Sequence, residues 1–377
     1  MKIEADWIDA DGPQAVMGLL TGPGHQAFFV GGCVRNALLG APVSDVDIAT
    51  DARPETVIEL AQDAGLKTVP TGIEHGTVTV ISGHDAFEVT TFRRDVDTDG
   101  RRAVVAFSDS VEEDARRRDF TMNALYADAD GTVFDPLGTG LPDLQARRVR
   151  FIDDPLERIR EDYLRILRFF RFHAWYGDPQ GGIDPDGMAA CGIALDGLDR
   201  LASERNWQEM KKLLSAPDPA PALAAMSACG ALPRLMPGAF AAPIPVMIHI
   251  EREAGLAPDP IRRLALLGGS IDRLRLSKAE AAQREVLLSD MSPAEMAWRH
   301  GPEVATDKLA MLAAQMGQRI DPEQRVFVRF AAQQSFPLRA ADLMPHLEGP
   351  ALGEALREAE ARWISSDFTL GKDDLLA

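Results

Sequence analysis

The stretch Phe28-Phe29-Val30-Gly31-Gly32-Cys33-Val34-Arg35 leads through Leu38-Leu39-Gly40 to Ser44-Asp45-Val46-Asp47-Ile48. Its pattern predicts a buried strand at 28–30, a glycine turn and a helix over 34–39. A glycine turn that opens a helix leaves backbone N–H groups without partners, and these suit the phosphates of a nucleotide. Residues two apart on a strand point to the same face, so Asp45 and Asp47 would aim two carboxylates at one point and hold a divalent metal.

Each of these signals alone has a plainer explanation, because Asp-x-Asp is common on solvated turns and Gly-Gly is often only a tight turn. In this order and spacing, however, the residues resemble the signature of the DNA polymerase β-like nucleotidyltransferases. Within that superfamily they are similar to the tRNA nucleotidyltransferase and poly(A) polymerase family, bacterial-eukaryotic type. The resemblance implies that Gly31, Gly32 and Arg35 bind the nucleotide phosphates. Most relatives carry aspartate where this chain has Asn36, so a charge-based role is not transferred to that position.

Bulk properties place the chain among ordinary globular proteins. It has 377 residues, of which 46% are hydrophobic and 26% charged, enough for two or three domains. No stretch is apolar enough to span a membrane and the start lacks the regions of a signal peptide, so we expect a cytoplasmic protein. The three cysteines are far apart and predict neither disulfides nor a zinc site. The net charge of -18 argues against non-specific nucleic-acid binding, but it does not exclude a local basic track among the arginines of 147–171.

The hydrophobic pattern divides the chain into a mixed part and a helical part. From residue 28 to about residue 134, strand-like runs alternate with short helices, whereas helical periodicity prevails after Asp153-Asp154-Pro155. A proline-rich break follows at 216–221. We therefore expect an α+β protein with a polymerase β-like nucleotidyltransferase head, which has a mixed sheet with helices, at 1–140. An all-α neck at 141–215 and an all-α body and tail at 216–377 would follow.

Glu88 lies in the middle of a predicted strand, where a glutamate is usually solvated or paired with an arginine. The family resemblance reverses this preference, because in relatives the acidic residue before Val-Thr-Thr-x-Arg completes a carboxylate triad. Asp45, Asp47 and Glu88 would then be the catalytic residues and would hold two Mg²⁺ ions about 3.5–4 Å apart. The expected reaction is attack of an RNA 3′-hydroxyl on the α-phosphate of a nucleoside triphosphate, with release of pyrophosphate.

A second block, residues 116–125, reads Arg-Arg-Arg-Asp-Phe-Thr-Met-Asn-Ala-Leu. A capped, salt-bridged helix start is the default explanation for such a run. The block is nevertheless similar to the family motif that contacts the ribose of the incoming nucleotide. The resemblance assigns this role to Arg117, Arg118, Asp119 and Asn123.

A third block contains Glu161, Asp162 and Arg165. We expect Asp162 and Arg165, three residues apart on one helix face, to reach a common ligand, although an intrahelical ion pair is the simpler possibility. The carboxylate can accept from the exocyclic amine of cytosine or adenine while the guanidinium donates to the ring nitrogen; guanine and uracil would leave both groups unpaired. The block resembles the Glu-Asp-x-x-Arg motif with which the family reads the base. Arg168, Glu204 and Arg205 would support the pocket.

The resemblance implies an enzyme that adds CCA to the 3′ end of tRNA from CTP and ATP. A polar loop between Arg94 and Arg116 supports A addition, since enzymes that add only CC are shortened there. The helices towards the C-terminus, one of them beginning near Pro350, would contact tRNA. A poly(A) polymerase, an A-adding enzyme and an inactive RNA-binding module are the alternatives. The histidines of the helical part show no ligand spacing, which argues against an appended phosphohydrolase domain.

Overall fold

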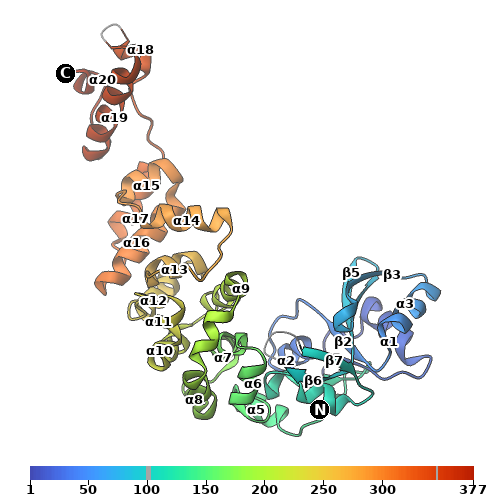
Figure 1. Ribbon diagram of the computed structural model, residues 1–377. Coiled ribbons are helices and arrows are strands. Elements are labelled where there is room, and N and C mark those ends of the chain that lie inside the picture. The colour runs from blue at the N-terminus through green and yellow to red at the C-terminus, as the bar shows by residue number, and fades with distance from the viewer. Residues whose placement is uncertain (99–102, 345–346) are drawn as a thin grey trace. The chain divides into compact units, whose positions relative to one another are not determined.

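The computed structural model describes residues 1–98, 103–344 and 347–377 (Figure 1). Its contacts divide the chain into two compact units. Unit 1 comprises Met1–Glu209 and Pro221–Leu235, and unit 2 comprises Met210–Ala220 and Met236–Ala377. The predicted head and most of the predicted neck therefore lie together in unit 1. The division at residues 140 and 215 stays a prediction.

Unit 1 contains a seven-stranded mixed sheet of order β3-β4-β5-β2-β1-β8-β9. Only the central pair, β2 and β5, is parallel. A separate hairpin of β6 and β7 follows β5 in the chain. The strands predicted at 28–30, 77–81, 86–90 and 104–107 are confirmed. The strand bounds are β1 Ala27–Val30, β2 Asp47–Thr50, β3 Lys67–Gly72, β4 Thr77–Ser82, β5 Asp85–Thr91, β6 Arg93–Thr98, β7 Ala103–Phe107, β8 Tyr126–Ala127 and β9 Val133–Phe134.

Helices α1 (Asp11–Thr21) and α3 (Pro54–Asp63) contact each other and strands β4 and β5, so they cover one face of the sheet (Figure 1). Phe87 of β5 points to this face, because a Cβ built on Gly12 of α1 would lie 3.1 Å from its ring. Side chains alternate along a strand. Glu88 therefore points to the opposite face, where it is exposed.

The remainder of unit 1 is mainly helical, and α6 contacts both α7 and α8. The apolar residues of α7 predicted to face a core are buried, among them Ile166, Leu167 and Phe170. The ring of Phe120 lies 4.8 Å from that of Phe172 and 4.9 Å from that of Phe151, centroid to centroid, so an aromatic cluster joins the mixed and helical parts of the unit. The helices are α2 Gly32–Leu38, α4 Val111–Arg116, η2 Thr121–Asn123, α5 Gly140–Gln145, α6 Pro155–Glu161, α7 Leu164–Tyr176, α8 Pro185–Ile193, η3 Leu195–Arg200, α9 Ser203–Leu214, α10 Ala220–Cys229 and α11 Ala231–Leu235. From Met210 onward, α9 belongs to unit 2.

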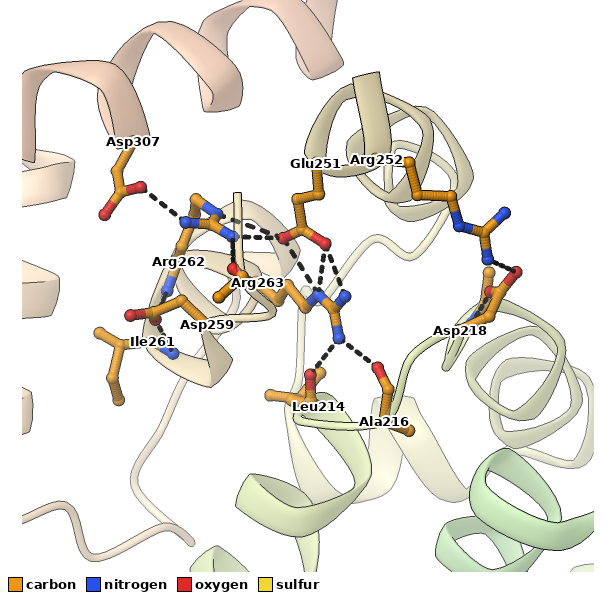
Figure 2. A network of polar contacts seen from close by, with 12 residues as sticks. Leu214, Ala216, Asp218, Glu251, Arg252, Asp259, Ile261, Arg262, Arg263 and Asp307 are labelled. Carbon is orange, nitrogen blue, oxygen red and sulfur yellow. Dashed lines mark hydrogen bonds and ion pairs between the residues drawn. The ribbon is translucent and has the colours of Figure 1, made fainter. Parts of the chain in front are cut away.

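Every element that the structure describes in unit 2 is a helix. A buried ion network centred on Glu251 of α12 and Arg263 of α13 lies in this unit (Figure 2), and Trp363 of α19 belongs to a separate apolar cluster. The predicted helix near Pro350 is confirmed as α19. Among the described residues, no helix has the length and apolarity that a membrane span requires. The helices are α12 Ile244–Ala254, α13 Pro260–Leu267, α14 Lys278–Leu288, α15 Pro293–His300, α16 Pro302–Met316, α17 Pro322–Ala331, α18 Ala340–Leu343, α19 Gly349–Ser365 and α20 Lys372–Leu376.

Candidate active site

The parallel pairing of β2 and β5 brings two acidic residues together. Asp47 and Glu88 are register partners on these neighbouring strands, so their side chains leave the sheet on the same face. Burial raises the pKa of Asp47, and the charge of Glu88 raises it further, while Arg118 opposes the shift. Two carboxylates are thus held side by side at a point where a cation would relieve their repulsion.

Asp45 lies just outside this sheet pair. We expected Asp45 and Asp47 on one strand, but β2 begins at Asp47, so the strand-spacing argument for Asp45 is wrong. The segment before β2 leaves Asp45 exposed, and its carboxylate accepts a hydrogen bond from the Ser44 hydroxyl at 2.9 Å. Asp45 is still near enough for its charge to raise the pKa of Asp47. In the described part of the chain, no three acidic, histidine or cysteine side chains form a group that could hold a metal ion.

The glycine turn has the geometry that the sequence predicts. Gly31 has a φ of 72° and precedes α2, and a Cβ at this position would lie 3.3 Å from Nη1 of Arg118. Glycine is therefore required both by the left-handed backbone and by the approach of this arginine. The N–H of Gly31 donates to the carbonyl of Leu125 at 3.1 Å, and the N–H of Arg35 donates to the carbonyl of Gly31 at 2.9 Å. The N–H groups that could serve a phosphate are therefore those of Gly32, Cys33 and Val34 in the first turn of α2.

Arg35 is held by other side chains of the protein, and its expected contact with a phosphate stays a prediction. Its buried guanidinium donates to Oδ1 of Asn123 and to the hydroxyl of Tyr176, and it lies 4.0 Å from the centroid of the Tyr176 ring. Asn36 accepts from the same guanidinium and donates its amide to the carbonyl of Pro42 at 2.8 Å. An ionised aspartate could not make that donation. Arg35 thus links α2 to η2 and α7, and Asn36 fixes the segment that leads to Asp45.

Two of the four predicted ribose residues, Asp119 and Asn123, share a polar network with Arg168. Asp119 is buried and accepts from Asn123 at 2.8 Å and from Nε of Arg168 at 2.7 Å. Burial would raise the pKa of Asp119, but Arg168 and Asn123 outweigh it and the pKa is lowered. Arg168 also approaches Glu209 of α9 at 3.7 Å. Through Arg168, this network joins the mixed part of unit 1 to its helical part, which suits the supporting role predicted for that arginine.

The helix predicted to carry both base-reading residues is interrupted between them. Helix α6 ends at Glu161 and α7 begins at Leu164, so Asp162 and Arg165 do not share a helix face and that prediction is wrong. Asp162 accepts from the N–H of Leu164 at 3.0 Å and from Nη2 of Arg205 at 2.6 Å. Arg165 donates to the carboxylate of Glu161 and to the carbonyl of Arg158. All three residues of this block are nevertheless within one turn of the break.

Arg117 and Arg118 are held by a carboxylate that the sequence analysis passed over. Asp114, fully buried, forms ion pairs with Arg117 at 2.7 Å and with Arg118 at 3.0 Å. The only signal available was spacing, since Asp114 precedes these arginines by three and four residues. Tyr126 and Tyr176 gave no signal, because Arg118 and Arg35 lie 8 and 141 residues from them, outside the spacing of neighbours on a helix.

Two expected features have a more limited place in the structure. The polar loop predicted between Arg94 and Arg116 is in part the β6–β7 hairpin, and its residues 99–102 lie outside the described residues. Glu204 and Arg205 lie in the first turn of α9, where Arg205 contacts Asp162 as described above.

A mixed sheet that pairs two carboxylates beside a glycine turn, followed by helices, defines the nucleotidyltransferase class. A family model described as the poly A polymerase head domain matches residues 27–150, and one described as a probable RNA and SrmB- binding site of polymerase A matches residues 182–242. The mouse mitochondrial CCA tRNA nucleotidyltransferase 1 is 31% identical over 97% of this chain and 89% of its own length. The chain belongs to this family of CCA tRNA nucleotidyltransferases.

Other relatives align over a shorter stretch or by structure. The human mitochondrial CCA tRNA nucleotidyltransferase 1 is 40% identical over 54% of this chain, which spans 47% of the human protein. A CCA-adding enzyme of Streptococcus pyogenes is 44% identical over 55% of this chain and 50% of its own length. The solved structure of the Bacillus stearothermophilus CCA-adding enzyme in complex with CTP has a TM-score of 0.74 and 30% identity, covering 94% of this chain and 93% of that one.

Proposed function

We propose that the protein adds C and A residues to the 3′ end of tRNA, using CTP and ATP and releasing pyrophosphate. The observation that carries this proposal is the Asp47–Glu88 pair, register partners on β2 and β5, with Asp47 next to the end of β1 where the Gly31 turn begins. The similarity to a CTP-bound CCA-adding enzyme over nearly the whole chain supports the choice of substrate.

The acidic pair suits Mg²⁺, which prefers hard oxygen ligands and shares them with substrate phosphates. Asp47 and Glu88 would hold it, with Asp45 beside them, and the raised pKa of Asp47 reflects a cluster of negative charge that a cation would offset. Two bound Mg²⁺ ions would activate the 3′-hydroxyl and neutralise the charge of the leaving pyrophosphate. The protein's own part is to hold the carboxylates and the nucleotide in place.

The remaining predicted residues would select the nucleotide. Asn123 donates to Asp119 and accepts from Arg35 of α2, the helix that follows the Gly31 turn, and the resemblance implies that Asp119 and Asn123 contact the ribose. Asp162 and Arg165 would read the base, with Glu161 orienting Arg165 and Arg205 orienting Asp162. A cytosine or adenine amine can donate to Asp162, whereas the carbonyl of uracil or guanine would face a carboxylate and be rejected.

Incorporation assays on tRNA that lacks its terminal CCA test this function. With CTP and ATP, the wild-type protein should restore CCA and stop. Asp47→Asn or Glu88→Gln should lower the rate about a thousandfold or more, because several kcal/mol of charge stabilisation is lost. Asp85→Asn, an exposed carboxylate on the same strand as Glu88, is the matched control and should keep full activity.

Three outcomes would contradict the proposal. Long A tails on unrelated RNA would indicate a poly(A) polymerase. Extension that occurs only with ATP, and only on tRNA that already ends in CC, would indicate an A-adding enzyme. If Asp47→Asn and Glu88→Gln both had rates like the wild type, the acidic pair would not be needed for catalysis.

A further inference from the structure

Asp114 is a buried carboxylate that the proposed mechanism does not yet use. It lies on α4, is fully buried, and has four donors around its two oxygens. Oδ1 accepts from Nε of Arg117 at 2.8 Å and from the N–H of Arg93 at 3.4 Å. Oδ2 accepts from Nη2 of Arg118 at 3.0 Å and from the hydroxyl of Tyr126 at 2.7 Å. The carboxylate is therefore fully satisfied and fixed.

Tyr126 completes a ring of hydrogen bonds around Arg118. Its hydroxyl donates to Asp114 and accepts from Nε of Arg118 at 3.1 Å, and the ring lies 5.4 Å from the guanidinium carbon. Tyr126 is itself buried in β8, where it is the register partner of Val30, the residue before Gly31. The adjacent ends of β1 and β8 thus carry the glycine turn and the tyrosine that orients Arg118.

These contacts leave one end of Arg118 directed at the turn. Its Nε and Nη2 are held by Tyr126 and Asp114, while Nη1 lies 3.3 Å from the place of a Cβ on Gly31. The main chain is fixed from the other side, because Arg158 donates to the carbonyls of Arg117 and Arg118. A guanidinium held from both sides loses little conformational freedom when it binds an anion or a hydroxyl.

We infer that Asp114 and Tyr126 are positioning residues that hold Arg118 against the Gly31 turn and so set the affinity for the incoming nucleotide. The inference rests on the proposed function for the identity of that nucleotide. It concerns how this site is preorganised: the two residues act through Arg118 and do not contact the substrate. Arg118 would present a fixed positive charge where the nucleotide meets the acidic pair.

Equilibrium binding of CTP to the full chain, measured calorimetrically without tRNA, tests the inference together with steady-state kinetics. Asp114→Asn should raise Kd and KM about tenfold, the loss expected when a charged hydrogen-bond partner is removed, while kcat changes much less. Tyr126→Phe keeps the aromatic ring and should raise Kd and KM about threefold. This variant replaces Asp114→Asn in the test if Asp114→Asn does not fold. Asp143→Asn removes another buried carboxylate, paired with Arg150 at 2.9 Å and Thr121 at 2.7 Å, and should leave Kd unchanged.

A double-mutant cycle separates positioning from general destabilisation. On an Arg118→Met background, Asp114→Asn should cause no further change in Kd, because the residue through which it acts is already gone. The inference is overturned if both single variants bind CTP like the wild type, or if the effects of Asp114→Asn and Arg118→Met multiply. A wild-type protein that binds CTP but does not extend tRNA would refute the proposed function. The role of Asp114 and Tyr126 could still be tested in that case, because the Kd for CTP is measured without tRNA.

Discussion

The pairing of Asp47 with Glu88 is unfavourable in the absence of a cation. Like charges opposite each other on neighbouring strands destabilise a sheet, and the pKa of Asp47 is raised by burial and by Glu88. A carboxyl group with a raised pKa in the folded state contributes stability below its ordinary pKa, and this contribution is lost as the pH rises through the folded value. At neutral pH the folded protein therefore bears the repulsion that its candidate metal site requires.

Glu88→Gln should consequently stabilise the protein while removing activity. Without metal, in EDTA at pH 7.5, we expect a gain in the free energy of unfolding of up to about 1 kcal/mol, because the repulsion of Asp47 is removed. The gain should shrink as the pH falls towards the ordinary range of aspartate, where Asp47 is protonated in both proteins. Urea unfolding across this pH range checks it, with Asp85→Asn as the control. A variant less stable than the wild type at pH 7.5 would contradict the assigned repulsion.

The element that sequence reasoning described least well is the α6–α7 junction. The strand around Glu88 and the buried face of α7 follow from local periodicity, whereas a strand at Asp47 was expected only from the Asp-x-Asp spacing and begins two residues later than that spacing implies. The break at Asp162 was not predicted, because the apolar spacing runs on from Ile159 through Leu164 to Phe170 without a proline or glycine. Two contacts of the Asp162 carboxylate accompany the end of α6. One is local: the carboxylate accepts from the N–H of Leu164, which competes with the hydrogen bonds of a continuous helix. The other is an ion pair with Arg205, which is 43 residues away.

Contacts between residues far apart in the chain leave no repeating pattern in the sequence. For the same reason, the sequence did not predict some contacts within the candidate active site. Asp47, Glu88 and Asp119 could be named from motifs, but the partners that orient Arg118 and Arg35 could not. Tyr176, for example, lies 141 residues from Arg35 and ends a helix whose pattern indicates only a buried face.

The geometry of this junction can be tested through Gly197. A Cβ on Gly197 of η3 would lie 1.8 Å from the ring of Tyr163, one of the two residues between α6 and α7. Gly197→Ala should therefore displace Tyr163, cost about 1–3 kcal/mol through overpacking, and weaken the preference for CTP over UTP. Thermal unfolding and the ratio of kcat/KM for the two nucleotides measure this. The control is Gly192→Ala on α8, where the atom nearest to a new Cβ would be 3.9 Å away. If Gly197→Ala left the preference for CTP unchanged, the α6–α7 junction would not contribute to base recognition.

The buried ion network of Glu251 and Arg263 lies within unit 2. Glu251, 3% exposed, bonds to Arg262 at 2.7 Å and to Arg263 at 2.5 Å (Figure 2). Arg263 is fully buried and also donates to the carbonyls of Leu214 and Ala216, while Arg262 bonds to Asp307 at 2.6 Å. The network thus joins the end of α9 to α12, α13 and α16, and all of its members belong to unit 2.

Because a buried ion pair costs most when one partner is removed, Glu251→Gln should lower the free energy of unfolding of unit 2 by about 3–5 kcal/mol. The loss arises because Arg263 keeps only carbonyl partners and Arg262 keeps Asp307 as its one carboxylate among the described residues. Hydrogen exchange should show faster exchange in α12, α13 and α16, whereas β1, β2 and β5 keep their protection and the affinity for CTP is unchanged. The neighbouring Arg252, exposed and paired with Asp218 at 3.4 Å, provides the control Arg252→Gln, which should change stability by less than about 0.5 kcal/mol. Equal loss of protection in the strands of unit 1 would mean that the two units unfold as one and that the buried ion network stabilises the whole chain.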